Sequence, residues 1–275
     1  MAKKTDLIAR VFYLKNRTYI TPNYIRIALE NDYISEYKNA TIGVNNKIFV
    51  APEGTDKVHL PEFDSEKMDW KPMAAELRPH RRTYTHRGID LEKNEIYIDF
   101  VAHGDDGPAS AWAIHAPIGA ELGVVMRKEP HQLYVKADWY LLVGDATAIP
   151  VLAAILEDLP ATARGFAVIE VESVEDIQQI HTQSQVFIKW IINPTPGQNS
   201  TLASEAEQLV STLDEVSKFA YVAAEFSTVK AIRTLLRKTL LWTSDELHAY
   251  SYWKYGKSET SSETDRRAER EEIGA

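Results

Sequence analysis

The chain has 275 residues, of which 44% are hydrophobic and 26% charged, and its formal net charge is −9. This composition is typical of a folded globular protein with one or two domains. Cysteine is absent, which excludes disulfides and cysteine-ligated zinc or iron–sulfur clusters within this chain. The acidic balance also disfavours nucleic acid as a partner, because that binding depends mainly on positive charge.

The N-terminal stretch MAKKTDLIAR has two lysines but no apolar segment behind them, so we predict no signal peptide. No apolar run approaches the roughly 20 residues that a membrane-spanning helix needs. These features predict a cytoplasmic protein. The eight histidines form no HxxxH or HExxH pair, so we predict no protein-bound metal.

The first half of the chain is predicted to be β-rich. Ile96, Ile98 and Phe100 alternate with Tyr97 and Asp99, as in a strand with one buried face. Several such segments with few helical stretches favour an antiparallel barrel or sandwich. The predicted strands span 10–20, 24–31, 47–52, 57–61, 81–89, 95–103 and 122–128.

The pattern changes near residue 137 to alternating strands and helices, which predicts parallel βαβ units. The fold class is therefore an N-terminal antiparallel β-barrel followed by a parallel-sheet α/β domain. We place the domains at 1–135 and 136–257, with a charged tail at 258–275 that is either a solvated helix or disordered. The predicted strands span 139–144, 166–173, 185–193, 219–224 and 249–253, and the helices 151–159, 202–213 and 228–240.

A basic strand with the sequence RRTYTHR occupies residues 81–87. It is compatible with a nucleic-acid patch, a phosphate-bearing cofactor or a solvated strand face. Shortly after it, Gly107 supplies a turn and Pro108 suits the first position of a short helix. The unpaired N–H groups of such a helix form an anion site, to which Ser110 adds a hydroxyl donor. The alternative is a plain surface turn.

A second glycine turn, VGDATAIP at 143–150, follows the first strand of the α/β domain. Open α/β sheets bind ligands at this position, where a strand ends and a helix begins. The turn has only Gly144 and lacks the GxGxxG pattern, so a simple strand-to-helix connection is the alternative.

Together these segments resemble the siderophore-interacting proteins, which are flavin-dependent ferric-siderophore reductases, in order and over nearly the whole chain. The motifs are R-x-Y-T-x-R, HGxxGPASxWA, GDxTAxP and YWKxG. They are carried here by Arg82, Tyr84, Thr85 and Arg87; by His103, Gly104, Gly107, Pro108, Ala109, Ser110, Trp112 and Ala113; by Gly144, Asp145, Thr147, Ala148 and Pro150; and by Tyr252, Trp253, Lys254 and Gly256.

The resemblance implies that the barrel binds FAD. Tyr84 would pack on the isoalloxazine ring and Thr85 would meet its edge near N5. Arg82 would meet a phosphate or ring oxygen, with Arg87 supporting the site. The turn at 107–110 would hold the pyrophosphate, and His103 and Trp112 complete the set. The strand alternation puts His86 on the face opposite Thr85, where we expect a surface residue.

The resemblance also implies that the α/β domain binds NAD(P)H through Gly144, Asp145 and Thr147, with Glu225, Tyr252 and Trp253. Glu170, Glu172, Glu175 and Asp176 follow the second strand without a nearby cation, which favours NADH over NADPH. Ala224 and Ser251 stand where the family usually has glycine. A related branch uses ferredoxin as the electron donor instead.

A ferric siderophore would dock near the flavin on the cations His59, either Arg127 or Lys128, and Lys254; the alternative is that these are ordinary surface residues. The predicted activity is an electron relay from NAD(P)H through FAD to Fe(III), in a monomer without a catalytic side chain. Alternatives are a flavin reductase of the same superfamily with ferredoxin as donor or another small acceptor, and a binding module without turnover.

Overall fold

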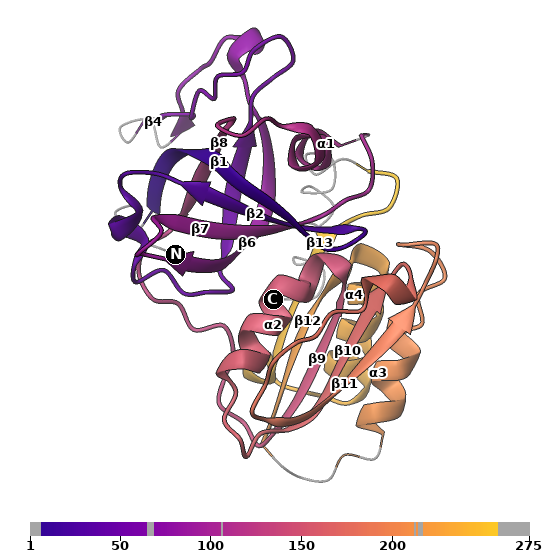
Figure 1. Cartoon of the computed structure of the whole chain (residues 1–275). Helices are drawn as coiled ribbons and strands as arrows, with labels where there is room; N and C mark the ends of the chain where they lie inside the picture. The colour runs from indigo at the N-terminus through magenta and orange to yellow at the C-terminus, as the bar shows by residue number, and fades with distance from the viewer. Residues whose placement is uncertain (1–6, 65–68, 106, 212, 214–216, 258–275) are drawn as a thin grey trace. The chain divides into compact units, whose positions relative to one another are not determined.

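The computed structural model describes residues 7–64, 69–105, 107–211, 213 and 217–257 (Figure 1). The predicted tail at 258–275 lies outside these residues. Two compact units divide the chain, Met1–His131 and Gln132–Ala275. Each unit is described by itself below.

The first unit is a closed barrel in which six antiparallel strands follow the order β1-β2-β7-β6-β3-β8. Closure leaves no unpaired edge within this sheet. A short two-stranded pair and the α-helix α1 accompany the barrel. The elements are β1 (Leu7–Thr21), β2 (Tyr24–Glu30), β3 (Asn45–Val50), β4 (Phe63–Asp64), β5 (Asp69–Trp70), β6 (His80–Asp90), β7 (Glu95–Val101), α1 (Pro108–His115) and β8 (Glu121–Arg127).

Alternating side chains fill the barrel interior, as the sequence predicts. Ile96, Ile98 and Phe100 of β7 are fully buried in one apolar cluster with residues from the other strands. Tyr97, which lies between them, is only partly buried. The period-2 pattern therefore reports the inner face of this strand correctly.

The predicted strand at 57–61 is wrong, because this segment has no regular secondary structure. Val58 and Leu60 instead cover the outer face of β8 at Gly123, where an added Cβ would lie 2.6 Å from Leu60 Cδ2 and 3.0 Å from Val58 Cγ1. The Val58 N–H donates to the Glu121 carboxylate at 2.8 Å rather than to a neighbouring strand. The apolar residues of this segment thus pack on the sheet without joining it.

His86 is not the surface residue that we expected. It does lie on the face opposite Thr85, but that face is the barrel interior, because His86 pairs across the sheet with the core residue Ile98. Its exposure is 0%, and neither ring nitrogen has a hydrogen-bond partner in the part of the chain that the structure describes. Alternation separates the two faces of a strand but does not say which one is covered.

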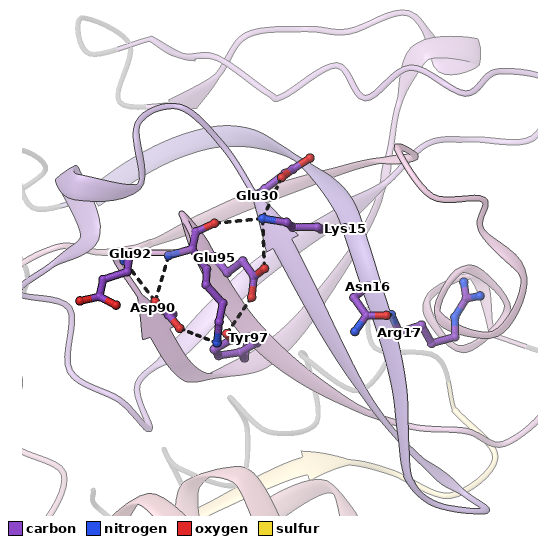
Figure 2. Close-up of polar contacts among 9 residues, drawn as sticks. Lys15, Asn16, Arg17, Glu30, Asp90, Glu92, Glu95 and Tyr97 are labelled. Atoms are coloured by element: carbon purple, nitrogen blue, oxygen red, sulfur yellow. Dashed lines mark hydrogen bonds and ion pairs between the residues drawn. The ribbon is translucent and has the colours of Figure 1, made fainter.

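The outer face of the barrel carries a charged cluster around Lys15 (Figure 2). Lys15 Nζ lies 3.1 Å from Glu95 and 3.3 Å from Glu30, and it joins β1 to β2 and β7. Since the Lys15 side chain is 38% exposed, solvent screens these pairs and their contribution to stability is small. On the same strand, Arg17 donates to the carbonyls of Ala113 and Ala116 at the C-terminal end of α1, where a cation is favourable.

The second unit has a parallel five-stranded sheet in the order β11-β10-β9-β12-β13. α3 and α4 pack on one face in a common apolar cluster, and α2 lies on the other face, where Leu152 approaches Gly144. The elements are β9 (Trp139–Asp145), α2 (Ile149–Asp158), β10 (Arg164–Val171), β11 (Gln185–Ile192), α3 (Leu202–Val210), β12 (Lys218–Glu225), α4 (Phe226–Thr234) and β13 (Leu247–Trp253).

The carboxyl ends of these strands share one edge of the sheet. β9 lies in the middle of the sheet. The connections after β9 lead outward to β10 and β11 on one side, and β12 and β13 are then added on the other side of β9, so the strand order reverses between β9 and β12. Such a switch point opens a crevice at the carboxyl edge, where open α/β sheets bind their ligands. The fold therefore predicts a ligand site at the ends of β9 and β12.

Candidate functional site

An aromatic cluster joins β6, β7 and α1. The Tyr84 ring packs against Phe100 with centroids 4.3 Å apart, and Phe100 in turn lies 6.2 Å from Trp112 of α1. Tyr84 remains partly exposed, whereas Phe100 is fully buried. One face of the Tyr84 ring is thus fixed by protein contacts, which is the arrangement that a stacking partner for a flat ligand requires.

The other predicted flavin residues of β6 divide between the two faces of the strand. Arg82 shares the face of Tyr84, and its Nη1 donates to the Arg81 carbonyl at 2.8 Å. Thr85 lies on the outer face and is 4% exposed. Arg87 Nε lies 3.8 Å from Asp99 Oδ2, also on the outer face. The structure therefore places Tyr84 and Arg82 together and Thr85 with Arg87 on the other side of the strand.

The turn before α1 has the form that an anion site needs. Gly107 is the N-cap residue and Pro108 opens the helix, and no side chain among the described residues caps its first N–H groups. An added Cβ at Gly107 would lie 2.9 Å from His103 Cε1, so the imidazole lies directly against the glycine. Ser110 is 1% exposed, and its Oγ accepts the His103 N–H at 3.1 Å. His103 and Ser110 thus hold the turn with its N–H groups available.

Asp145, at the end of β9, joins three strands at the carboxyl edge of the second unit. Its Oδ1 accepts the Thr147 N–H at 2.9 Å and also the Thr147 hydroxyl. Its Oδ2 accepts the Glu225 N–H and the Trp253 Nε1–H, each at 2.8 Å. Burial raises the pKa of Asp145, although these hydrogen bonds oppose the shift. Both carboxylate oxygens are therefore engaged by protein donors, and Asp145 organises the site around it.

Glu225 repeats this arrangement one strand further along. It is 5% exposed and caps α4, where its Oε2 accepts the Ser227 N–H and hydroxyl, while its Oε1 accepts the Tyr255 N–H at 3.2 Å.

Gly144 makes the close approach of β9, β12 and α2 feasible. An added Cβ there would lie 2.5 Å from Ala148 Cβ and 2.8 Å from the Ala223 carbonyl oxygen.

The end of β13 lies against the loop that follows β11. Gly197 has a φ of +80°, and an added Cβ would lie 2.5 Å from the Trp253 ring. The pairing of β12 with β13 shifts by one residue between Ser251 and Trp253, which leaves Tyr252 as an extra residue. Such a bulge re-aims the following side chain, here the indole that reaches Asp145. The structure thus brings the predicted residues Gly144, Asp145, Thr147, Glu225 and Trp253 together at one edge.

Glu170 adds a third buried carboxylate to this edge. It pairs across the sheet with Asp145 and is 5% exposed. Its Oε2 lacks a hydrogen-bond partner among the described residues. Burial raises the pKa of Glu170, against opposing hydrogen bonds from Ser200 and Asn193. The edge is therefore acidic, which is unfavourable for a phosphate and compatible with hydroxyl groups.

The predicted docking cations of the barrel lie at different places on it. His59 is exposed and lies near Glu121 at the start of β8, whereas Arg127 ends that strand, roughly 20 Å further along at the usual rise per residue. Lys128 follows Arg127 and is partly buried. In the second unit, Lys254 Nζ lies 4.4 Å from the Phe226 ring centroid in a cation–π contact.

Sequence reasoning missed four residues that lie beside the candidate site residues, namely Arg17, Arg26, Asp99 and Gly197. Asp99 had been placed on the polar face of its strand, yet its side chain is 1% exposed because two arginines cover it. In the sequence, Asp99 shows only as a charged residue that alternates with apolar ones, and this pattern does not identify its partners on other strands. Among the described residues, no three His, Cys, Asp or Glu side chains are arranged to hold a metal ion, and no helix is long and apolar enough to cross a membrane.

A six-stranded antiparallel barrel followed by a parallel α/β unit with a carboxyl-edge site defines the ferredoxin-reductase fold. Consistent with this, phthalate dioxygenase reductase has the same fold, with 15% identity, a TM-score of 0.56 and coverage of 88% of this chain and 68% of that one. Residues 13–130 match the siderophore-interacting FAD-binding domain, and residues 137–256 match the siderophore-interacting protein model.

This chain belongs to the siderophore-interacting protein family. It is 32% identical over 250 residues to the ferric vibriobactin reductase ViuB of Vibrio cholerae, covering 91% of both chains. The crystal structure of the siderophore-interacting protein SipS from Aeromonas hydrophila is 29% identical, with a TM-score of 0.79 and coverage of 94% of this chain and 97% of that one. A siderophore utilization protein from T. fusca gives 28% identity, a TM-score of 0.81 and coverage of 92% and 95%.

The geometry of the barrel fits FAD. The uncapped N-terminus of α1 suits a pyrophosphate, Gly107 allows close approach of the backbone, and the supported Tyr84 ring suits a flat heterocycle.

Proposed function

We propose that this protein is a ferric-siderophore reductase, in which FAD on the barrel passes electrons from a nicotinamide nucleotide to Fe(III) held in a siderophore. The observation that carries the proposal is the similarity to a ferric vibriobactin reductase over 91% of both chains. Reduction would release the iron, because Fe(II) is held more weakly than Fe(III) by hard oxygen chelators. The chain itself supplies binding and orientation.

In this proposal the barrel residues hold and orient the cofactor. FAD, when bound, converts the two-electron donation of the nucleotide into one-electron steps. Tyr84 presents its ring to the isoalloxazine, and the main chain of Thr85, whose side chain lies on the other face of the strand, approaches the ring edge. The N–H groups at the start of α1 bind the pyrophosphate, with the turn fixed by the His103–Ser110 hydrogen bond. Arg82 and Arg87 balance the negative charge of the cofactor.

The carboxyl edge of the second unit binds the nucleotide, and its acidity supports NADH rather than NADPH. Glu170 is buried there with one oxygen unpartnered among the described residues, and Glu172 and Glu175 lie exposed just beyond it. A carboxylate accepts ribose hydroxyls, whereas it repels the extra phosphate of NADPH. Asp145 fixes the Trp253 indole and the Glu225 backbone, which shape the pocket for the nicotinamide.

The first test follows the flavin absorbance in a stopped-flow instrument. We expect the FAD-loaded protein to bleach rapidly with NADH, at least about tenfold more slowly with NADPH, which corresponds to roughly 1.4 kcal/mol of discrimination, and to recover its colour when a ferric hydroxamate is added. Bound FAD that neither nucleotide bleaches would support the ferredoxin-fed branch instead. Failure to bind FAD at all would contradict the proposal and favour a module without turnover.

The second test concerns docking of the ferric siderophore on Lys128 and Lys254. We expect Lys128→Met and Lys254→Met each to lower the ratio of siderophore reduction to dye reduction about fivefold to tenfold, because each removes a cation facing an anionic or neutral oxygen-rich ligand. The measurement is kcat/KM for both acceptors. Lys189→Met is the matched control, since Lys189 pairs with Glu205 on α3. Equal losses with both acceptors would contradict the docking role.

A further inference from the structure

One buried carboxylate on the outer face of the barrel is shared by two arginines. Arg26 Nε and Nη2 donate to Asp99 Oδ1 and Oδ2, each at 2.8 Å, in a bidentate pair. Arg87 Nε lies 3.8 Å from Asp99 Oδ2. The exposed fractions of the side chains are 33% for Arg26, 16% for Arg87 and 1% for Asp99. The carboxylate is therefore the buried centre of the cluster, and the guanidinium groups are its rim.

The three residues come from three adjacent strands, β2, β7 and β6. Arg26 and Asp99 are directly opposite each other in the β2–β7 ladder. Arg87 lies where the β6–β7 register shifts, between the His86–Ile98 and Gly88–Tyr97 pairs. A bulge re-aims the side chain at the irregularity, and backbone hydrogen bonding alone does not fix the direction of the re-aimed group. A contact with a fixed side chain on the neighbouring strand supplies that direction.

Asp99 is itself fixed, because Arg26 binds both of its oxygens in the geometry that limits rotation of a carboxylate. The Asp99 carboxylate is 1% exposed, against 10% for Glu95 in the Lys15 cluster (Figure 2), so solvent screens the Arg26–Asp99 pair somewhat less. Arg26 therefore fixes the position of the Asp99 carboxylate, and this carboxylate in turn restricts the Arg87 guanidinium. Arg87 belongs to the R-x-Y-T-x-R strand that carries Tyr84 and Thr85.

We propose that Asp99 is a positioning residue for the flavin site, which holds the Arg87 guanidinium in one place on the outer face of the strand that carries Tyr84 and Thr85. The inference rests on the proposed FAD site. The direction in which FAD affinity changes when the charge of Asp99 is removed distinguishes two roles for this residue. FAD is anionic, so loss of a negative charge at position 99 would strengthen its binding if charge alone mattered. If Asp99 acts by holding Arg87, the same loss weakens binding, because Arg87 must then be ordered when the cofactor binds.

The experiment is a double-mutant cycle on the dissociation constant of FAD, measured by quenching of flavin fluorescence on titration of the apoprotein. Asp99→Asn should raise this constant about tenfold, the effect expected for one charge-assisted hydrogen bond. Arg87→Met should raise it by a similar factor. Adding Asp99→Asn to Arg87→Met should change it by less than about twofold, because non-additivity is the mark of two residues that act together.

Glu95→Gln is the matched control. Glu95 lies on the same strand and outer face, its side chain is 10% exposed, and it pairs with Lys15 (Figure 2). It should leave the FAD constant within about twofold of wild type, since Glu95 contacts Lys15 and the Tyr97 hydroxyl instead. Thermal unfolding of each apoprotein checks that the barrel is folded, and Asp99→Glu should recover part of the affinity.

Two outcomes would overturn the inference while FAD still binds the wild-type protein. One is an unchanged or lower dissociation constant in Asp99→Asn, which would leave only the charge effect. The other is an equal loss in the presence and absence of Arg87, which would make Asp99 a general stabiliser of the barrel. If the wild-type protein does not bind FAD, the proposed function fails first, and this result is distinct from both.

Discussion

Asp145→Asn should destabilise the second unit by about 2–4 kcal/mol, the cost of leaving buried donors without their acceptor. The Asp145 oxygens accept four hydrogen bonds from Thr147, Glu225 and Trp253. An amide replaces one of these oxygens with an NH2 group, which would then face donors. Urea unfolding followed by tryptophan emission measures this loss, and the KM for NADH should rise because the indole is no longer held.

Thr147→Val is the control for Asp145→Asn, because it removes the hydroxyl donor and keeps the backbone N–H. It should cost about 1 kcal/mol, the typical net value of one hydrogen bond. If Asp145 served only as a ligand for the nucleotide, Asp145→Asn would weaken nucleotide binding without changing the urea midpoint. That result would contradict the organising role that its four hydrogen bonds indicate.

His86 should make the stability of the protein depend on pH between about 6.5 and 4. Burial without a partner lowers the pKa of His86 to about 4 in the folded chain. The unfolded chain binds this proton below about pH 6.5, and the folded chain binds it only near pH 4. Unfolding is therefore favoured as the pH falls through this window, by up to about 3 kcal/mol for a shift of this size.

His86→Leu should remove this dependence, since leucine does not titrate. The measurement is the free energy of unfolding in urea at several pH values from 7.5 to about 4, taken as the difference between wild type and variant. This difference should be constant above pH 7 and should change by about 3 kcal/mol towards pH 4. At pH 7 the variant should be at least as stable as wild type, because no orphaned polar group remains buried. Parallel curves of unfolding free energy against pH for the two proteins would contradict the burial of a neutral His86. The control for the loss of one histidine is His181→Leu, because His181 is exposed.

The family and the order of the two domain types could be predicted from the sequence, whereas the roles of the candidate site residues stay predictions. The alternation of Ile96, Ile98 and Phe100 identified a strand with one buried face, and the structure buries all three completely. Gly107 and Pro108 identified the start of α1. These predictions succeed because they depend on local properties, namely the period of a strand and the backbone preferences of glycine and proline.

Only the tertiary structure decided which groups meet. Alternation separated His86 from Thr85 but did not show that the face of His86 is the barrel interior. The segment with Val58 and Leu60 has the apolar residues of a strand, yet it packs on the outside of β8. Asp99 read as an ordinary polar position until the register placed it between Arg26 and Arg87.

The same applies to Asp145, whose motif indicated a site while only the structure showed both oxygens engaged by protein donors. The physical reason is common to these cases. Local sequence sets the period and direction of side chains along one strand, whereas burial, charge pairing and hydrogen-bond partners depend on the register between strands that lie far apart in the chain.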